Sequence, residues 1–139
     1  MGAMLTVHVD GGSRGNPGPA AVAAVATDAA GATAGEAAEF IGETTNNVAE
    51  YRAVQLGLRL ARDLGADRVE VVNDSELVAR QISGAYKVKN AGLKPLYLET
   101  MKAFREFSEW RIRNVRREHN ERADQLVNIE LDRVLSELR

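Results

Sequence analysis

Near its N-terminus the chain reads Val7-His8-Val9-Asp10-Gly11-Gly12-Ser13-Arg14-Gly15-Asn16-Pro17-Gly18. Apolar and polar residues alternate from Met4 to Asp10, and this period of two predicts a β-strand. The glycines, asparagine and proline that follow favour a turn and disfavour the start of a helix. The segment therefore delivers the Asp10 carboxylate to the end of a strand beside flexible backbone, where it is suited to hold a metal ion or a phosphate.

The composition is that of an ordinary globular protein. The chain has 139 residues, 45% hydrophobic and 27% charged, which predicts one domain over residues 4–139. We interpret Met1-Gly2-Ala3 as a remnant of an expression vector, with Met4 as the natural start. The lack of cysteine excludes disulfides and thiolate metal sites and favours a cytoplasmic location, and no apolar run approaches the length of a membrane span. Because the net charge is −2, nucleic-acid binding would need a local basic patch or metal ions.

The residues after the first turn predict a β-hairpin and then a long helix. Ala20–Thr27 and Ala32–Ile41 flank a turn that contains Asp and Gly, although their alanine content favours helix by intrinsic propensity. The cluster Thr44-Thr45-Asn46-Asn47 is typical of a helix N-cap and Gly65 of a helix end, so a helix is predicted from Asn47 to Leu64. Its expected buried face has three- and four-residue spacing and comprises Tyr51, Val54, Leu58, Ala61 and Leu64.

A second strand is predicted over Arg68–Asp74, and like the first it ends on an acidic residue. A right-handed crossover would make the two strands parallel and bring Asp10 and Asp74 to the same edge of the sheet. Helices are expected over Ser75–Ser83, Leu93–Phe107 and Glu121–Leu138, and a third parallel strand over Trp110–Arg116. Three arginines on the polar face of that strand are interpreted either as a solvated surface or as phosphate contacts.

Four acidic residues are expected at the ends of these elements. Asp10 and Asp74 end strands, whereas Glu50 and Asp124 lie in the first turns of helices. Taken alone, Glu50 is compatible with a favourable charge at a helix N-terminus and Asp74 with an N-cap. Together the four would repel one another unless cations intervene. An all-oxygen set suits Mg²⁺ or Mn²⁺, and two such ions about 4 Å apart would activate water and stabilise the leaving oxygen of a phosphodiester.

Other phosphate-binding and hydrolytic motifs fit less well. The segment Gly11–Gly15 lacks the Gly-Lys-Ser/Thr end of a P-loop and the spacing of a dinucleotide-binding loop, and it leads into a predicted hairpin. The chain also has no G-x-S-x-G nucleophile motif. The acidic residues therefore carry the functional prediction.

Five blocks of the chain resemble the type 1 ribonuclease H family, in order and along essentially the whole length. They are Asp10-Gly-Gly-Ser-Arg-Gly-Asn-Pro-Gly-Pro19, Thr45-Asn-Asn-Val-Ala-Glu50-Tyr51, Asp74-Ser-Glu-Leu-Val78, Gly84-Ala-Tyr-Lys-Val-Lys89 and Arg117-Glu-His-Asn-Glu-Arg-Ala-Asp124. The resemblance implies an α/β ribonuclease H-like fold, with a five-stranded mixed sheet of order 3-2-1-4-5 and helices on both faces. It implies an endonuclease that hydrolyses the RNA strand of RNA–DNA hybrids and leaves 5′-phosphate and 3′-hydroxyl ends. It assigns catalytic roles as ligands of two Mg²⁺ or Mn²⁺ ions to Asp10, Glu50, Asp74 and Asp124.

The resemblance also implies contacts with the substrate. Asn16, Asn46 and Asn47 match positions that face the minor groove of the hybrid, where an amide can donate to and accept from a 2′-hydroxyl. Thr45 matches a contact with a DNA phosphate, and Tyr86 lies near an aromatic position that packs against DNA sugars. From the residues alone, turn and cap chemistry for the asparagines and core packing for Tyr86 are equally open.

Two features depart from many bacterial members of the family. The segment Tyr86–Pro95 is too short and too weakly basic to contain their basic handle, so the chain resembles the shorter subtype found in archaea and in some fused bacterial proteins. The loop before Asp124 is also short, and His119 is its only histidine. An auxiliary catalytic role in product or metal release and a plain surface position are both open for His119, and Glu118 is a further candidate for outer-sphere contact with a metal.

Three functions remain open at the level of the sequence. They are a hybrid-specific endonuclease, a non-catalytic module that binds RNA–DNA hybrids, and a different metal-dependent nuclease on the same fold, with double-stranded RNA as a further candidate substrate. The four acids argue against a pure binding module, and the Thr45-Asn46-Asn47 block favours an enzyme that reads ribose. We expect a monomer that does not associate with membranes.

Overall fold

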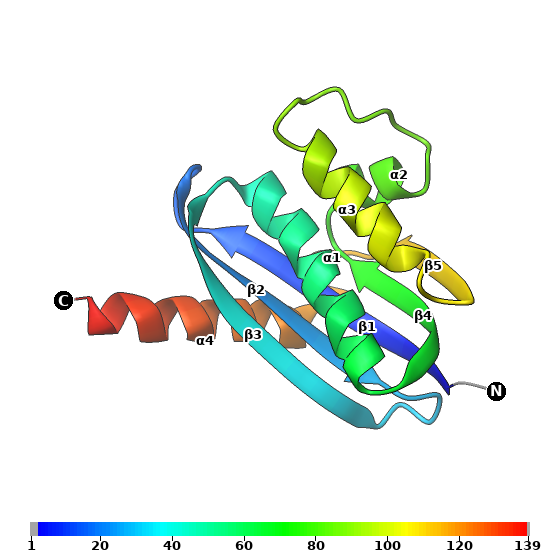
Figure 1. The fold of residues 1–139 in the computed structure, drawn as a ribbon. Coiled ribbons are helices and arrows are strands. Elements are labelled where there is room, and N and C mark those ends of the chain that lie inside the picture. Colours follow the sequence, from blue (N-terminus) through cyan, green and yellow to red (C-terminus); the bar gives the residue numbers. More distant parts are fainter. Residues whose placement is uncertain (1–2, 139) are drawn as a thin grey trace.

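Strand β1 (Ala3–Ser13) is the central strand of a five-stranded sheet in this computed structural model, which describes residues 3–138 (Figure 1). The other strands are β2 (Gly18–Thr27), β3 (Thr33–Thr44), β4 (Ala66–Asn73) and β5 (Glu109–Asn114). Their order across the sheet is β3-β2-β1-β4-β5. Neighbours are antiparallel from β3 to β1 and parallel from β1 to β5. The mixed sheet expected from the sequence, with the same strand order, is confirmed.

Helices cover both faces of the sheet, as expected (Figure 1). On one face lie α1 (Asn46–Asp63), α2 (Glu76–Ile82) and α3 (Lys94–Phe104), and on the other lies α4 (Glu121–Glu137), which follows the short 3₁₀ helix η1 (Arg117–His119). The main core packs under α1 and α3 and includes Tyr51, Leu58 and Phe104. A smaller core under α4 comprises Ala21, Ala23, Val127 and Leu131.

The alanine-rich segment forms β2 because both of its faces are buried. Every residue from Ala20 to Ala26 is at most 5% exposed, since α1 packs against one face of β2 and α4 against the other. Small side chains let both helices approach the strand closely. Burial on two faces therefore outweighs the intrinsic preference of alanine for helix, which amounts to a few tenths of a kcal/mol per residue.

Several details of the predicted elements are wrong. Strand β1 continues through Ser13, because β2 pairs with it up to that residue. Leu64 caps the C-terminus of α1 and is 41% exposed, since it reaches only the edge strand β3 near Gly35. Helix α3 ends at Phe104, where the chain begins its turn into β5. Strand β3 continues through Thr44 rather than ending at Ile41, and β5 ends at Asn114 rather than at Arg116.

Candidate active site

The point where β1 and β4 stop pairing brings two of the predicted acids to one edge of the sheet. These parallel strands pair in register up to His8 and Val72, and Asp10 and Asp74 each follow by two residues. Helix α1 crosses β1 so closely that a Cβ on Gly11 would lie 2.1 Å from the Ala49 carbonyl oxygen. Glycine is therefore required at this position for the helix to carry Glu50 to the same edge.

Three carboxylates converge there. Asp10, Glu50 and Asp74 each offer an oxygen atom, and these atoms all lie within 4.8 Å of one another. Asp10 is 6% exposed and Glu50 is 7% exposed. Asp124, in the first turn of α4, lines the same hollow, whose volume is about 430 Å³. The structure thus brings all four predicted acids to one pocket.

The capping roles that were open for two of these acids are wrong, and Glu50 lies just beyond the first turn of α1 rather than within it. Thr45 is the N-cap of α1, and its hydroxyl accepts a hydrogen bond from Val48 N at 3.3 Å. Glu50 instead accepts a hydrogen bond of 2.9 Å from Gly11 N, which ties α1 to β1. Ser75, not Asp74, caps α2 by accepting from Val78 N at 3.3 Å. The Asp74 carboxylate is therefore left to face the pocket.

Crowding and burial shift the acid–base behaviour of these groups. Burial, followed by the charges of Glu50, Asp74 and Asp124, raises the pKa of Asp10 to about 9. Burial also raises the pKa of Glu50 to about 7, even though the Gly11 N–H opposes this. For Asp74, burial raises the pKa, while the nearby Arg117 guanidinium works in the opposite direction. Such a cluster retains protons near neutral pH unless a cation compensates its charge, so the pocket fits a divalent cation.

Two arginines that the sequence analysis did not single out also line the pocket. Arg117 in η1 lies 3.8 Å from Asp124, measured from Nη2 to Oδ1. Arg14 in the turn after β1 forms an ion pair of 2.7 Å with Asp132 of α4. Both arginines lie inside the blocks that resemble the ribonuclease H family, and that position was the only signal for them. The direction of their side chains follows from tertiary structure alone.

The predicted substrate residues lie beside the acidic pocket. Asn46 lines the pocket, and its Oδ1 accepts from Ser13 N at 3.3 Å. Asn16 accepts from Asn46 N at 3.0 Å, which fixes the turn after β1 against the start of α1. Together with Thr45, Asn47 and Asn90, Asn16 lines a neighbouring hollow of about 320 Å³. Asn90 was missed because it lies in the α2–α3 loop, far away in sequence.

Tyr86 and His119 lie apart from the acidic pocket. Tyr86 is 46% exposed and lies under the Arg80 guanidinium, 5.5 Å from the ring centroid, so the core-packing alternative for this residue is wrong. His119 is exposed and lines a different hollow, on the α4 side of the sheet, together with His8 and Thr27. Glu118 is exposed on the same short helix η1.

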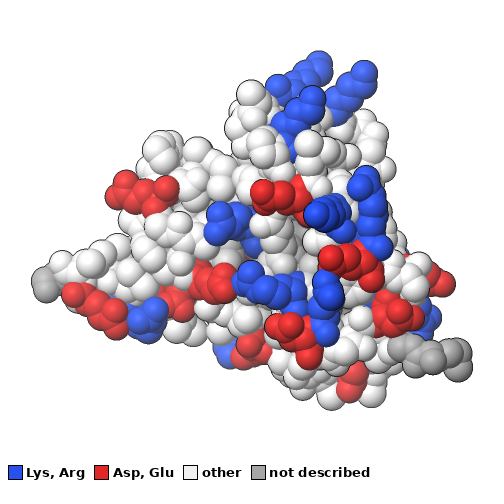
Figure 2. Space-filling view, viewed as in Figure 1, with Lys and Arg blue, Asp and Glu red and all other residues white. Residues whose placement is uncertain are grey.

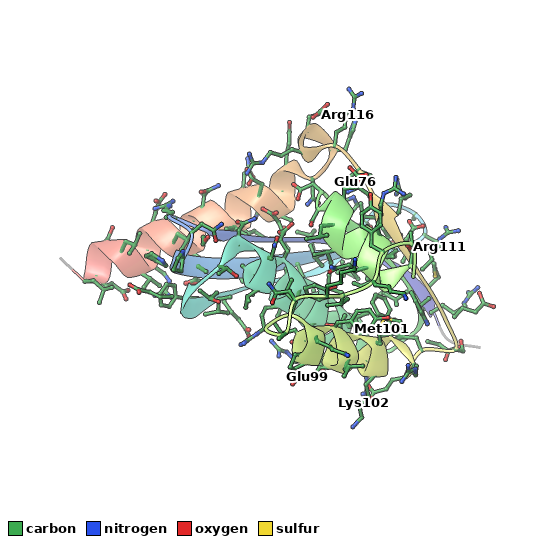
Figure 3. The ribbon with its side chains drawn as sticks, turned by 90° about the horizontal axis from the view of Figure 1, so that it is seen from above. Glu76, Glu99, Met101, Lys102, Arg111 and Arg116 are labelled. Carbon is green, nitrogen blue, oxygen red and sulfur yellow. The ribbon has the colours of Figure 1, made fainter. Side chains whose placement is uncertain are left out.

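The arginines predicted on β5 have two different environments. Arg111 and Arg113 both form ion pairs with Glu70 of β4, whose side chain is largely buried beneath them. Arg116 lies beyond the end of β5, near the start of α4 and away from Arg111 (Figure 3). Positive charge is also visible at the top of the molecule (Figure 2). The exposed Lys87 and Lys89 lie in the loop between α2 and α3, and the exposed Lys94 begins α3. No helix within residues 3–138 is long and apolar enough to cross a membrane.

The sheet order, the two-sided helix cover and the acidic pocket at the ends of β1 and β4 define the class of ribonuclease H-like proteins. Residues 8–129 match the family described as "Reverse transcriptase-like". The chain is 40% identical over 131 residues to ribonuclease HI of Halobacterium salinarum, covering 94% of this chain and 66% of the relative. It is 43% identical to the bifunctional protein Rv2228c of Mycobacterium tuberculosis, covering 92% of this chain and 35% of that protein. The chain thus spans about two thirds of one relative and about a third of the other.

Solved structures of ribonuclease H proteins are also similar to this chain. The crystal structure of RNase H1 from Halobacterium salinarum superposes with a TM-score of 0.91 at 40% identity, covering 93% of this chain and 98% of that one. LC11-RNase H1 in complex with an RNA/DNA hybrid superposes with a TM-score of 0.89 at 42% identity, covering 94% and 99%. This chain belongs to the reverse transcriptase-like family and, within it, to the type 1 ribonuclease H proteins.

Proposed function

We propose that this protein is an endonuclease that hydrolyses the RNA strand of RNA–DNA hybrids and leaves 5′-phosphate and 3′-hydroxyl ends. The observation that carries the proposal is the set of three carboxylates with oxygens within 4.8 Å of one another, joined by Asp124, at the edge of a ribonuclease H-like sheet. The similarity to ribonuclease HI and to a ribonuclease H1 bound to an RNA/DNA hybrid supports this choice of substrate.

The donor set fits two Mg²⁺ or Mn²⁺ ions when the substrate is bound. All four side chains offer carboxylate oxygens, which are the ligands that these cations prefer. Asp10, Glu50, Asp74 and Asp124 would hold the ions. When bound, the ions supply an activated water for attack on the phosphodiester and compensate the charge that develops on the leaving 3′ oxygen.

Other groups of the protein orient the Glu50 carboxylate and offset part of the negative charge of the four acids. The Gly11 N–H holds the Glu50 carboxylate toward β1, so this ligand is positioned before any ion binds. Arg117 lies close enough to Asp124 to offset part of the negative charge, and its guanidinium is suited to contact a phosphate of the RNA strand. Arg14 is held by Asp132 on another side of the same pocket.

Recognition of the hybrid is assigned to the hollow next to the acids. In this proposal Asn16, Asn46 and Asn47 face the minor groove, where their amides read the 2′-hydroxyls that distinguish RNA from DNA. Thr45 binds a phosphate of the DNA strand, and Asn90 supplies a further amide in the same hollow. The exposed Tyr86 ring offers a surface for the DNA sugars. An auxiliary role of His119 in turnover stays a prediction.

The decisive experiment presents one sequence as an RNA–DNA hybrid, double-stranded RNA, double-stranded DNA and single-stranded RNA. Each is incubated with Mg²⁺, Mn²⁺ or EDTA and resolved on a gel, beside Asp10→Asn and a matched control. The control is Asp63→Asn, which removes an exposed acid at the end of α1. We expect metal-dependent cutting of the RNA strand of the hybrid by the wild type and by the control, and none by Asp10→Asn.

The other outcomes separate the alternatives. Cutting of double-stranded RNA in addition would broaden the substrate class. A hybrid-specific mobility shift without cutting would indicate a binding module, and cutting of duplex DNA would indicate a different nuclease on this fold. Cutting of the hybrid by Asp10→Asn at the wild-type rate would remove the acidic pocket from the reaction.

A further inference from the structure

Asn120, the residue that immediately precedes α4, is buried against β1 next to Asp10. It is 2% exposed, although it lies between the exposed His119 and the exposed Glu121. Asparagine at this position ordinarily caps the helix through its side-chain oxygen. Here the Oδ1 atom is buried and has no hydrogen-bond partner among residues 3–138, so Asn120 does not serve as such a cap. Its side chain acts through its N–H groups instead.

The Asn120 amide reaches across to β1. Its Nδ2 atom donates a hydrogen bond of 2.8 Å to the Val9 carbonyl oxygen, 111 residues away in sequence. The last paired residues of β1 and β4 are His8 and Val72, so Val9 lies just beyond the parallel ladder. The amide thus satisfies a buried carbonyl that immediately precedes Asp10, at the point where the two strands stop pairing.

The backbone of the same residue contacts another of the acids. Its backbone carbonyl accepts from Asp124 N at 3.2 Å and so fixes the first turn of α4. One buried residue is therefore bonded both to the residue before Asp10, in β1, and to Asp124, in α4.

We infer that Asn120 is a positioning residue, which holds Asp10 and Asp124 at the mutual spacing that a divalent cation requires. This inference rests on the proposed role of the acidic pocket and adds a residue outside its ligand set. Asparagine suits the task because its amide supplies two N–H donors on a neutral side chain. Aspartate has the same shape but would replace these donors with acceptors and add a fifth negative charge.

The test compares Asn120→Ala and Asn120→Asp with two control variants. Asn114→Ala removes another asparagine at this sheet edge, whose Nδ2 lies 3.5 Å from the Asn73 carbonyl oxygen. Asp28→Ala removes the acceptor for Ala30 N and Ala32 N in the distant β2–β3 turn, so it lowers stability without touching the pocket. Each protein is studied as the full chain, below its melting temperature, for binding of Mn²⁺ alone by electron paramagnetic resonance and for kcat and KM on the hybrid.

We expect both Asn120 variants to bind Mn²⁺ about 10- to 100-fold more weakly and to lose kcat by a similar factor, because loss of an outer-shell partner has effects of this size. KM should stay within about twofold, since Asn120 is buried away from the substrate surface, and both controls should bind Mn²⁺ like the wild type. Wild-type Mn²⁺ affinity in the Asn120 variants would overturn the inference, as would equal weakening in Asp28→Ala. If the wild type binds Mn²⁺ but cuts no hybrid, the proposed function fails while the binding comparison still decides the role of Asn120.

Discussion

At the level of single residues, Asp10 has the most unfavourable charge in the pocket. Burial and three neighbouring acids raise its pKa to about 9, so in metal-free protein the folded state holds this proton more tightly than the unfolded chain. The resulting stabilisation is fully present below the unfolded pKa near 4 and is lost as the pH rises through about 9.

Asp10→Asn removes this loss of stability. In EDTA we expect the variant and the wild type to melt at similar temperatures near pH 4, and the variant to melt roughly 5 °C or more above the wild type near pH 9. Thermal unfolding followed by circular dichroism across this pH range measures the difference. A constant difference at all pH values would show that the Asp10 charge is not disfavoured in the folded protein.

A second residue-scale prediction concerns discrimination between RNA and DNA. Asn47 lines the hollow beside the acids but is not a member of the carboxylate cluster. Asn47→Ala should therefore lower the preference for a ribose-containing strand by roughly 10-fold, about the free energy of one hydrogen bond to a hydroxyl, while metal binding stays unchanged. Competition between matched hybrid and DNA duplexes for the inactive Asp10→Asn background measures this. An unchanged preference would exclude Asn47 from recognition.

At the level of elements, the close packing of α1 on β1 carries Glu50 into the pocket. A Cβ on Gly57 would lie 2.5 Å from Val9 Cγ1 and 3.0 Å from Val7 Cγ1. Gly57→Ala should therefore destabilise the fold by about 1–3 kcal/mol, because overpacking outweighs the better helix propensity of alanine. Urea denaturation measures the effect, and Arg52→Ala, on the exposed side of the same helix, should change stability by less than about 0.5 kcal/mol. Equal stability of Gly57→Ala and wild type would contradict the close packing of α1 and β1.

The elements also show which sequence signals were reliable. The N-cap cluster and Gly65 predicted α1 to within one residue at each end, because caps are local chemistry. The roles of Glu50 and Asp74 were ambiguous for the same reason: an acid near a helix start satisfies a local rule whether or not it faces a pocket. Only the packing of α1 on β1, and the use of Ser75 as the cap of α2, removed the ambiguity.

At the level of the whole molecule, an acidic protein is proposed to bind a polyanion. The net charge is −2, so the electrostatic contribution must come from a few local cations such as Lys87 and Lys89 in the α2–α3 loop and Lys94 at the start of α3. Binding of hybrid by Asp10→Asn should fall with salt with a log–log slope of about −2 to −4. Lys87→Ala combined with Lys89→Ala should reduce that slope by about 1–2, as fluorescence anisotropy can measure. A slope identical to that of the parent would exclude the loop from phosphate contact.

From the sequence, acids at the ends of expected elements predicted the four-carboxylate site, because alternation and capping residues are local patterns. The resemblance to a known family predicted the fold class and the strand order. The turn residues also predicted the hairpin, although the intrinsic propensity of alanine favours a helix. Tertiary structure alone decided that three carboxylates lie within 4.8 Å of one another, that Arg14, Arg117 and Asn90 face the hollows, and that Asn120 bonds to β1. These contacts join residues tens of positions apart, and side-chain direction at such distances depends on how the elements pack rather than on any local rule.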